Sequence, residues 1–155
     1  MENVNADLSI SRLIRAPRRA IWQAWAEPEL FARWWIPAPI ECRVVQLDLT
    51  PGGGFETRMR QPGQEVQPNL EGCFVEVVPG ERLAFTTCLT AGWRPHTPWL
   101  ALTAIMTLTE EAGGTRYCAR VLHRDAAEAA KHRAMGFSEG WGTVIGQLAA
   151  LVEPA

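Results

Sequence analysis

The chain has 155 residues, of which 47% are hydrophobic and 21% are charged, and its formal net charge is −2. This length is typical of one domain with a sizeable core, so we expect a single domain over residues 1–155. A nucleic-acid partner needs a strong basic excess, and membrane insertion needs an apolar run of about 20 residues. Secretion needs a signal peptide. The sequence shows none of these features, which favours a cytoplasmic protein.

The N-terminal part predicts one strand followed by two short helices. Residues 7–17 alternate between apolar and polar side chains up to Pro17, which is typical of a strand. Ile21 and Trp25 lie four residues apart with no helix breaker before Pro28, so residues 18–27 are predicted to form a helix. Pro28 suits the first turn of a second helix over residues 28–35.

The middle of the chain switches to a period of two and predicts six more strands. They are expected over residues 40–49, 55–60, 69–78, 82–89, 99–111 and 116–124. Polar loops rich in glycine and proline are predicted at 61–69 and 90–98. Strands joined mainly by hairpins favour an antiparallel sheet.

The last 30 residues predict a long C-terminal helix. Asp125 and Glu128 have the spacing of a capping box, and Phe137, Trp141 and Ile145 recur at helical spacing. A local kink is expected near Gly136. The pattern therefore predicts an α+β fold in which a curved antiparallel sheet wraps around the terminal helix and leaves a cavity between them.

Tryptophan and cysteine content add two expectations. Seven tryptophans supply more aromatic area than a core of this size needs, which is typical of a lined cavity or an interface. The four cysteines (Cys42, Cys73, Cys88 and Cys118) lie in strand-like segments and form no C-x-x-C pair. We expect buried free thiols and no metal site.

Four segments together resemble the START-like (SRPBCC) superfamily and, within it, the Activator of Hsp90 ATPase homologue-type proteins. They are IRAPRRAIWQAWAEPELFARWW, LDLTPGGGFETRM, GCFVEVVPGERLAFT and HRAMGFSEGWGTVIGQLAALV, and the resemblance runs from about Leu8 to Val152. It implies the helix-grip fold of START and Bet v 1 proteins, with a hydrophobic pocket that binds lipids, hormones, polyketides or other aromatics, and in a few members catalyses cyclisation. Hsp90 activation belongs to larger relatives with an additional N-terminal domain, so a chaperone partner is not the leading expectation here.

The first functional hypothesis is an apolar ligand pocket that requires no cofactor. Its walls are expected to come from the inner face of the strands and the inner stripe of the terminal helix, because ligand pockets are mostly apolar. The predicted ligand-binding residues are Trp35, Phe55, Met59, Phe74, Phe85, Trp99, Met106, Phe137, Trp141 and Ile145. The alternative is that these side chains simply fill the core.

The second hypothesis is an enzyme that acts on a pocket-bound substrate. His123 and Asp48 are its weak catalytic candidates, with His96, Glu76 and Tyr117 behind them. The sequence contains no recognisable catalytic motif, so catalysis has no positive support, and a surface or hydrogen-bonded residue is the favoured interpretation of each histidine.

The third hypothesis is a protein-interaction module, either a homodimer or a chaperone partner. Trp93 or Trp99 in the long loop could anchor a partner, or the same loop could cover the pocket mouth as a lid. Arg58, Arg60 and Arg82 could steer an anionic ligand, but solvated charges on the outer face of the sheet are the favoured interpretation.

Overall fold

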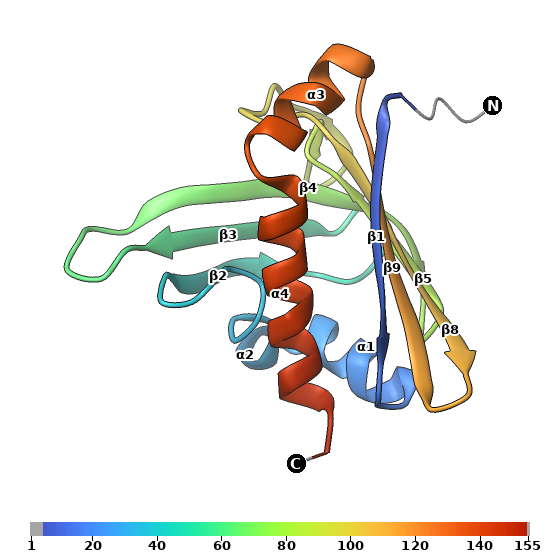
Figure 1. The fold of residues 1–155 in the computed structure, drawn as a ribbon. Helices are drawn as coiled ribbons and strands as arrows, with labels where there is room; N and C mark the ends of the chain where they lie inside the picture. The colour runs from blue at the N-terminus through green and yellow to red at the C-terminus, as the bar shows by residue number, and fades with distance from the viewer. Residues whose placement is uncertain (1–4, 155) are drawn as a thin grey trace.

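The computed structural model describes residues 5–154 and has the α+β architecture that the sequence predicts. The main sheet consists of β1 (Asp7–Ile14), β2 (Glu41–Leu47), β3 (Gly54–Arg60), β4 (Gln67–Val78), β5 (Arg82–Thr86), β8 (Thr103–Glu111) and β9 (Gly114–Leu122). A small hairpin consists of β6 (Leu89–Thr90) and β7 (Arg94–Pro95), and the helices are α1 (Arg18–Ala26), α2 (Pro28–Phe31), α3 (Ala126–Ala134) and α4 (Phe137–Val152). In Figure 1, α4 crosses the sheet with α3 at one of its ends and with α1 and α2 near the other.

The main sheet is antiparallel throughout and runs in the order β1-β9-β8-β5-β4-β3-β2. Three shifts in pairing register fall in its β2–β5 half, between Val44 and Gln46, between Thr57 and Arg58, and between Phe74 and Glu76. Each such bulge bends its strand and increases the local twist. The bulges therefore account for the curvature with which this half of the sheet wraps around α4.

The two helical regions differ from the predicted ones in where they end. The second helix stops at Phe31, not Trp35, because the backbone N–H groups of Arg33 and Trp34 donate to carbonyls only three residues earlier and the chain continues as turns. The predicted terminal helix is interrupted completely at Gly136, whose φ of 94° is a left-handed conformation that glycine adopts easily. The expected kink is therefore a break between α3 and α4.

The N-terminus of α3 is capped as predicted. The carboxylate of Asp125 accepts a hydrogen bond from the backbone N–H of Glu128 at 2.9 Å, which satisfies one of the free donors of the first turn.

The segment from residue 87 to residue 102 is the largest departure from the predicted strands. The hydroxyl of Thr87 donates to the carbonyl of Leu100 at 2.7 Å and accepts from the backbone N–H of Leu102 at 2.9 Å. These bonds replace strand pairing, so β8 begins at Thr103 and residues 99–102 leave the sheet. The predicted loop also contains the β6–β7 hairpin, and Cys88 lies exposed in the preceding turn, which corrects the expectation of a buried thiol there.

An aromatic cluster fills the middle of the molecule between the sheet and the helices. The indole N–H of Trp25 donates to the hydroxyl of Tyr117 and that of Trp34 to the carbonyl of Ala24, each at 3.0 Å. Phe55 and Phe85 stack with ring centroids 4.8 Å apart. Because buried indoles need a hydrogen-bond partner, these pairings let two of the seven tryptophans serve as core residues.

Candidate functional site

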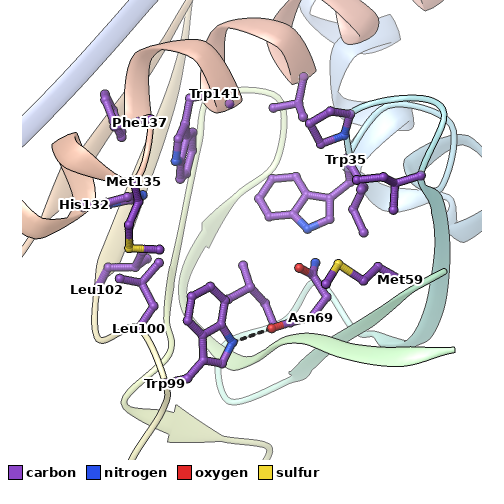
Figure 2. Close-up of a pocket in the computed structure, with 17 residues that line it drawn as sticks. Trp35, Met59, Asn69, Trp99, Leu100, Leu102, His132, Met135, Phe137 and Trp141 are labelled. Atoms are coloured by element: carbon purple, nitrogen blue, oxygen red, sulfur yellow. Dashed lines mark hydrogen bonds between the residues drawn. The ribbon is translucent and has the colours of Figure 1, made fainter. Parts of the chain in front are cut away.

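A pocket of about 280 Å³ lies beside the first half of α4. Its walls come from the segment after α2, from β3 and β4, from the residues before β8, and from the junction of α3 and α4. Figure 2 shows Trp35 and Met59 on one side, and His132, Met135 and Phe137 on the opposite side. The lining residues are Trp35, Ile36, Pro37, Ile40, Met59, Asn69, Leu70, Trp99, Leu100, Leu102, His132, Met135, Gly136, Phe137, Gly140, Trp141 and Val144.

The chemistry of this lining is almost entirely apolar. Asn69 and His132 are the polar residues among the lining residues, and no Asp, Glu, Lys or Arg belongs to the set. An ionised group placed here would lose its hydration without gaining a counter-charge, which is costly. The pocket therefore suits a neutral molecule.

Five of the ten predicted ligand-binding residues line this pocket: Trp35, Met59, Trp99, Phe137 and Trp141. The other five are Phe55, Phe74, Phe85, Met106 and Ile145, and they are packed in the hydrophobic core and do not line the pocket. Strand alternation and helix phase identify the face on which a side chain lies. They do not identify the position along that face where packing ends and open space begins.

Asn69 occupies a bulge at the edge of the pocket. Leu70 pairs with Thr57 and Pro68 pairs with Arg58, so Asn69 is the extra residue of β4. Its side-chain amide donates to the hydroxyl of Thr57 at 2.9 Å, and its backbone carbonyl accepts from the indole of Trp99. A bulge frees backbone groups from the ladder and redirects the side chain, and here both groups serve the pocket wall.

Trp35 is held in the opposite wall by a clamp from α4. Gln147 donates from its side-chain nitrogen to the carbonyls of Trp34 and Ile36, and accepts from the backbone N–H of Ala38, at 2.8–2.9 Å. Trp35 itself is 7% exposed and meets Trp141 edge to face at 6.1 Å. The clamp fixes both flanks of Trp35 and so sets the width of the pocket at this point.

The indole N–H of Trp35 remains available to a ligand. None of the described residues forms a hydrogen bond with it, yet every fully buried side-chain nitrogen or oxygen in residues 5–154 has a partner. The N–H must therefore reach solvent, and the pocket is the space that Trp35 lines. In Figure 2 the ring nitrogen of Trp35 is directed toward the pocket interior.

His132 lines the pocket from α3 and is paired with His123. Nδ1 of His132 lies 2.8 Å from Nε2 of His123, whose Nδ1 lies 2.9 Å from the carbonyl of Ala6. His132 is 6% exposed, and burial, together with the neighbouring His123, lowers its pKa from 6.5 to about 4. Its ring is therefore neutral at physiological pH.

The catalytic candidates do not assemble into one site. His123 lies beside β1 at one edge of the sheet, whereas the exposed Asp48 follows β2 at the other edge and accepts a hydrogen bond from Thr50. Tyr117 is buried in the core, which raises its pKa, and Glu76 is an exposed partner of Arg82, whose hydrogen bond lowers the pKa of Glu76.

The remaining candidate side chains occupy surface positions. His96 is half-buried in the segment after β7, and Arg58 and Arg60 form ion pairs with Glu56 and Glu41 on exposed parts of β3. The arginines are thus engaged by carboxylates of their own sheet and lie away from the apolar pocket.

Three residues that shape the pocket were missed from the sequence: Asn69, His132 and Gln147. Each is a polar residue whose role depends on a contact with a distant segment. No local sequence pattern therefore predicts that role. His132 was noted only for lying nine residues after His123, a spacing without metal-site character. The α3–α4 junction brings it to the pocket.

Within the described range, no group of three or more His, Cys, Asp or Glu side chains is arranged to hold a metal ion. The four cysteines are unpaired, and burial raises the pKa of Cys42 to about 12. None of the helices described is long and apolar enough to span a bilayer.

Comparison with known proteins places this architecture among solved relatives. A family model described as Activator of Hsp90 ATPase homolog 1-like protein matches residues 15–153. Protein NE0264 from Nitrosomonas europaea is 39% identical with a TM-score of 0.86, over 97% of this chain and 96% of that chain. Protein Ms6760 from Mycobacterium smegmatis is 27% identical with a TM-score of 0.79, over 99% of this chain and 94% of that chain. The comparison with curated proteins finds no match.

Proposed function

The chain belongs to the Activator of Hsp90 ATPase homolog 1-like protein family, and we propose that it binds a small, neutral, apolar or aromatic molecule in the pocket beside α4. The family resemblance and the helix-grip fold predicted from the sequence are both confirmed. The observation that carries the proposal is the apolar pocket itself, which lies beside a hydrophobic core of aliphatic and aromatic side chains.

The volume of the pocket limits the size of its ligand. Ligand pockets usually measure about 300–1,000 Å³, so a volume of about 280 Å³ falls just below that range. A molecule with one or two rings fits this space better than a long acyl chain. The rings of Trp35, Phe137 and Trp141 offer edges and faces for aromatic contact.

Two exposed apolar side chains border the pocket and mark its mouth. Trp99 is 65% exposed and Met135 is 59% exposed, and both belong to the lining. A single exposed apolar side chain is ordinary, but these two border the same pocket, and apolar side chains gathered at one place are typical of a binding site. Methionine also adapts readily to ligands of different shape.

Gly140 provides a direct way to test the pocket. No atom outside its own helical neighbours lies within 4 Å of a Cβ at this position, so a larger side chain has room to enter the pocket. We expect Gly140→Phe to fill the pocket and to abolish saturable binding of 2-fluoronaphthalene, measured by fluorine NMR and calorimetry. Gly140→Ala adds one methyl group, should retain binding, and should stabilise α4 by about 0.5–1 kcal/mol.

This test distinguishes a ligand-binding pocket from an interior that has no room for a ligand. The proposal is supported if the wild type and Gly140→Ala bind the probe saturably and a folded Gly140→Phe does not. Absence of saturable binding of both 2-fluoronaphthalene and 2-naphthol to the wild type, or unchanged binding to Gly140→Phe, would overturn it. Native mass spectrometry of freshly purified protein then identifies any small molecule that co-purifies.

The other functional hypotheses stay as predictions. The dispersed positions of His123 and Asp48 give the enzyme hypothesis no assembled site. For a homodimer or a chaperone partner, the exposed side chains of Trp93 and Trp99 are the predicted anchors. A cytoplasmic location and a single domain also remain proposals, and the unpaired cysteines agree with a reducing compartment.

A further inference from the structure

The histidine pair beside the pocket has a defined arrangement of protons. The carbonyl of Ala6 can only accept hydrogen bonds, so Nδ1 of His123 must carry the proton that it shares with this oxygen. The backbone N–H of His123 donates to the same carbonyl at 3.0 Å, which fixes the ring further. In the neutral ring, Nε2 of His123 is then an acceptor.

The ring of His132 has a defined arrangement of protons as well. When the ring of His123 is neutral, its Nε2 accepts at 2.8 Å and Nδ1 of His132 must be the donor. The remaining nitrogen of the neutral His132 ring, Nε2, therefore carries a lone pair and no proton. The burial that lowers the pKa of His132 keeps this ring neutral at physiological pH.

Nε2 of His132 has no partner within the described part of the chain. Among residues 5–154 no fully buried side-chain nitrogen or oxygen lacks a hydrogen bond, so this atom must retain contact with solvent. His132 is 6% exposed, lines the pocket, and meets the ring of Phe137 edge to face at 5.2 Å. Figure 2 shows both residues on the same side of the pocket.

We propose that Nε2 of His132 is the hydrogen-bond acceptor that selects a hydroxyl-bearing aromatic ligand, such as a phenol or naphthol. The inference rests on the proposed pocket function and adds the ligand's polar group to it. A phenolic hydroxyl satisfies this acceptor while its ring contacts Phe137 and Trp141. A carboxylate would place a charged acceptor opposite Nε2 of His132, which is itself an acceptor. An unsubstituted aromatic ring offers Nε2 no hydrogen-bond donor.

A matched pair of ligands isolates this hydrogen bond. 2-Naphthol and 2-fluoronaphthalene have nearly the same shape, but only the first can donate. Calorimetry at neutral pH measures the ratio of their dissociation constants in the wild type and in His132→Asn. The asparagine amide can replace Nδ1 as donor to His123 but places no atom at Nε2. His132→Gln is the second variant, because its longer side chain can return an acceptor to the Nε2 position.

We expect His132→Asn to lower the preference for 2-naphthol by about 3- to 10-fold, the range of one net hydrogen bond, and His132→Gln to retain part of it. In the wild type, nitrogen NMR of the imidazoles should show the unprotonated Nε2 signal of His132 shifting with 2-naphthol and staying in place with 2-fluoronaphthalene. The wild-type NMR result does not depend on the folding of any variant.

The possible failures are distinguishable. The role of His132 is overturned if both ligands bind and the preference for 2-naphthol over 2-fluoronaphthalene is equal in the wild type and in His132→Asn. It is also overturned if 2-naphthol binds without shifting the Nε2 signal of His132. In both cases the pocket function stands. If neither ligand binds the wild type, the pocket function falls and this inference falls with it.

Discussion

The indole N–H of Trp99 donates a hydrogen bond to the backbone carbonyl of Asn69 at 2.6 Å. Thirty positions separate the two residues, and the bond links the segment before β8 to the bulge of β4 at the side of the pocket (Figure 2). Since Trp99 is 65% exposed, this bond holds a large side chain in a position where solvent would otherwise let it move. The pair forms one border of the pocket mouth.

Removal of this border should change the rates of ligand exchange. We expect Trp99→Ala to raise the dissociation rate of 2-naphthol several-fold, because the mouth loses both the ring and its tether. Stopped-flow fluorescence measures the rate. Trp99→Phe is the matched control that keeps an aromatic ring without the donor, and an intermediate rate is expected. Identical rates in all three proteins would show that Trp99 does not guard the pocket.

The clamp formed by Gln147 should contribute both to stability and to binding. Gln147→Leu leaves the carbonyls of Trp34 and Ile36 and the N–H of Ala38 without their partner. The bonds to Trp34 and Ile36 are partly buried and the bond to Ala38 is exposed, so denaturant unfolding should show a decrease of about 1 kcal/mol. Affinity for 2-fluoronaphthalene should fall as well, because Trp35 is no longer held on both sides.

Gln147→Glu separates the two halves of the clamp. A carboxylate can still accept from the N–H of Ala38 but cannot donate to the two carbonyls. We therefore expect Gln147→Glu to be less stable than the wild type, by at least part of the loss seen in Gln147→Leu. Wild-type stability in both variants would contradict the role assigned to Gln147.

His132 makes stability depend on pH in a defined window. In the unfolded chain its imidazole takes up a proton around pH 6.5, whereas in the folded protein it does so only near pH 4. Between these values the unfolded state holds more protons, so the free energy of unfolding must fall as the pH falls. We expect a decrease of about 2 kcal/mol between pH 6.5 and pH 4.5, above the range in which the paired carboxylates titrate.

The matched variant for this measurement is His132→Asn, which cannot titrate but keeps a donor for His123. Urea unfolding across the same pH range should give a distinctly shallower slope in the variant than in the wild type. Parallel slopes would mean that His132 is protonated as easily in the folded state as in the unfolded chain.

The sequence predicts the fold well because the relevant signals are local and repeated. The alternation in residues 103–108 and the helical recurrence of Phe137, Trp141 and Ile145 place side chains on the correct inner faces. The break at Gly136 is stronger than the expected kink, since the left-handed conformation of one glycine ends α3 and starts α4. Local composition alone does not show how far the chain turns there.

The site is less predictable because it depends on pairings between distant segments. Phe85 and Trp35 satisfy the same apolar pattern, yet one is enclosed by the core and the other borders open space. Asn69 reaches the pocket only because β3 and β4 pair with a bulge at that point. The acceptor role of His132 requires the ring of His123 and the carbonyl of Ala6, which lies 117 positions from His123.

The most direct test of the pocket is a nitrogen–proton NMR spectrum of the seven tryptophan indoles during titration with 2-naphthol. Trp35 and Trp141 line the pocket and Trp99 borders its mouth, whereas Trp25 and Trp34 donate to fixed partners in the core. We predict saturable shifts of the Trp35, Trp141 and Trp99 signals with little change in the Trp25 and Trp34 signals. A titration in which no indole signal moves, or in which the two core signals move most, would contradict ligand binding beside α4.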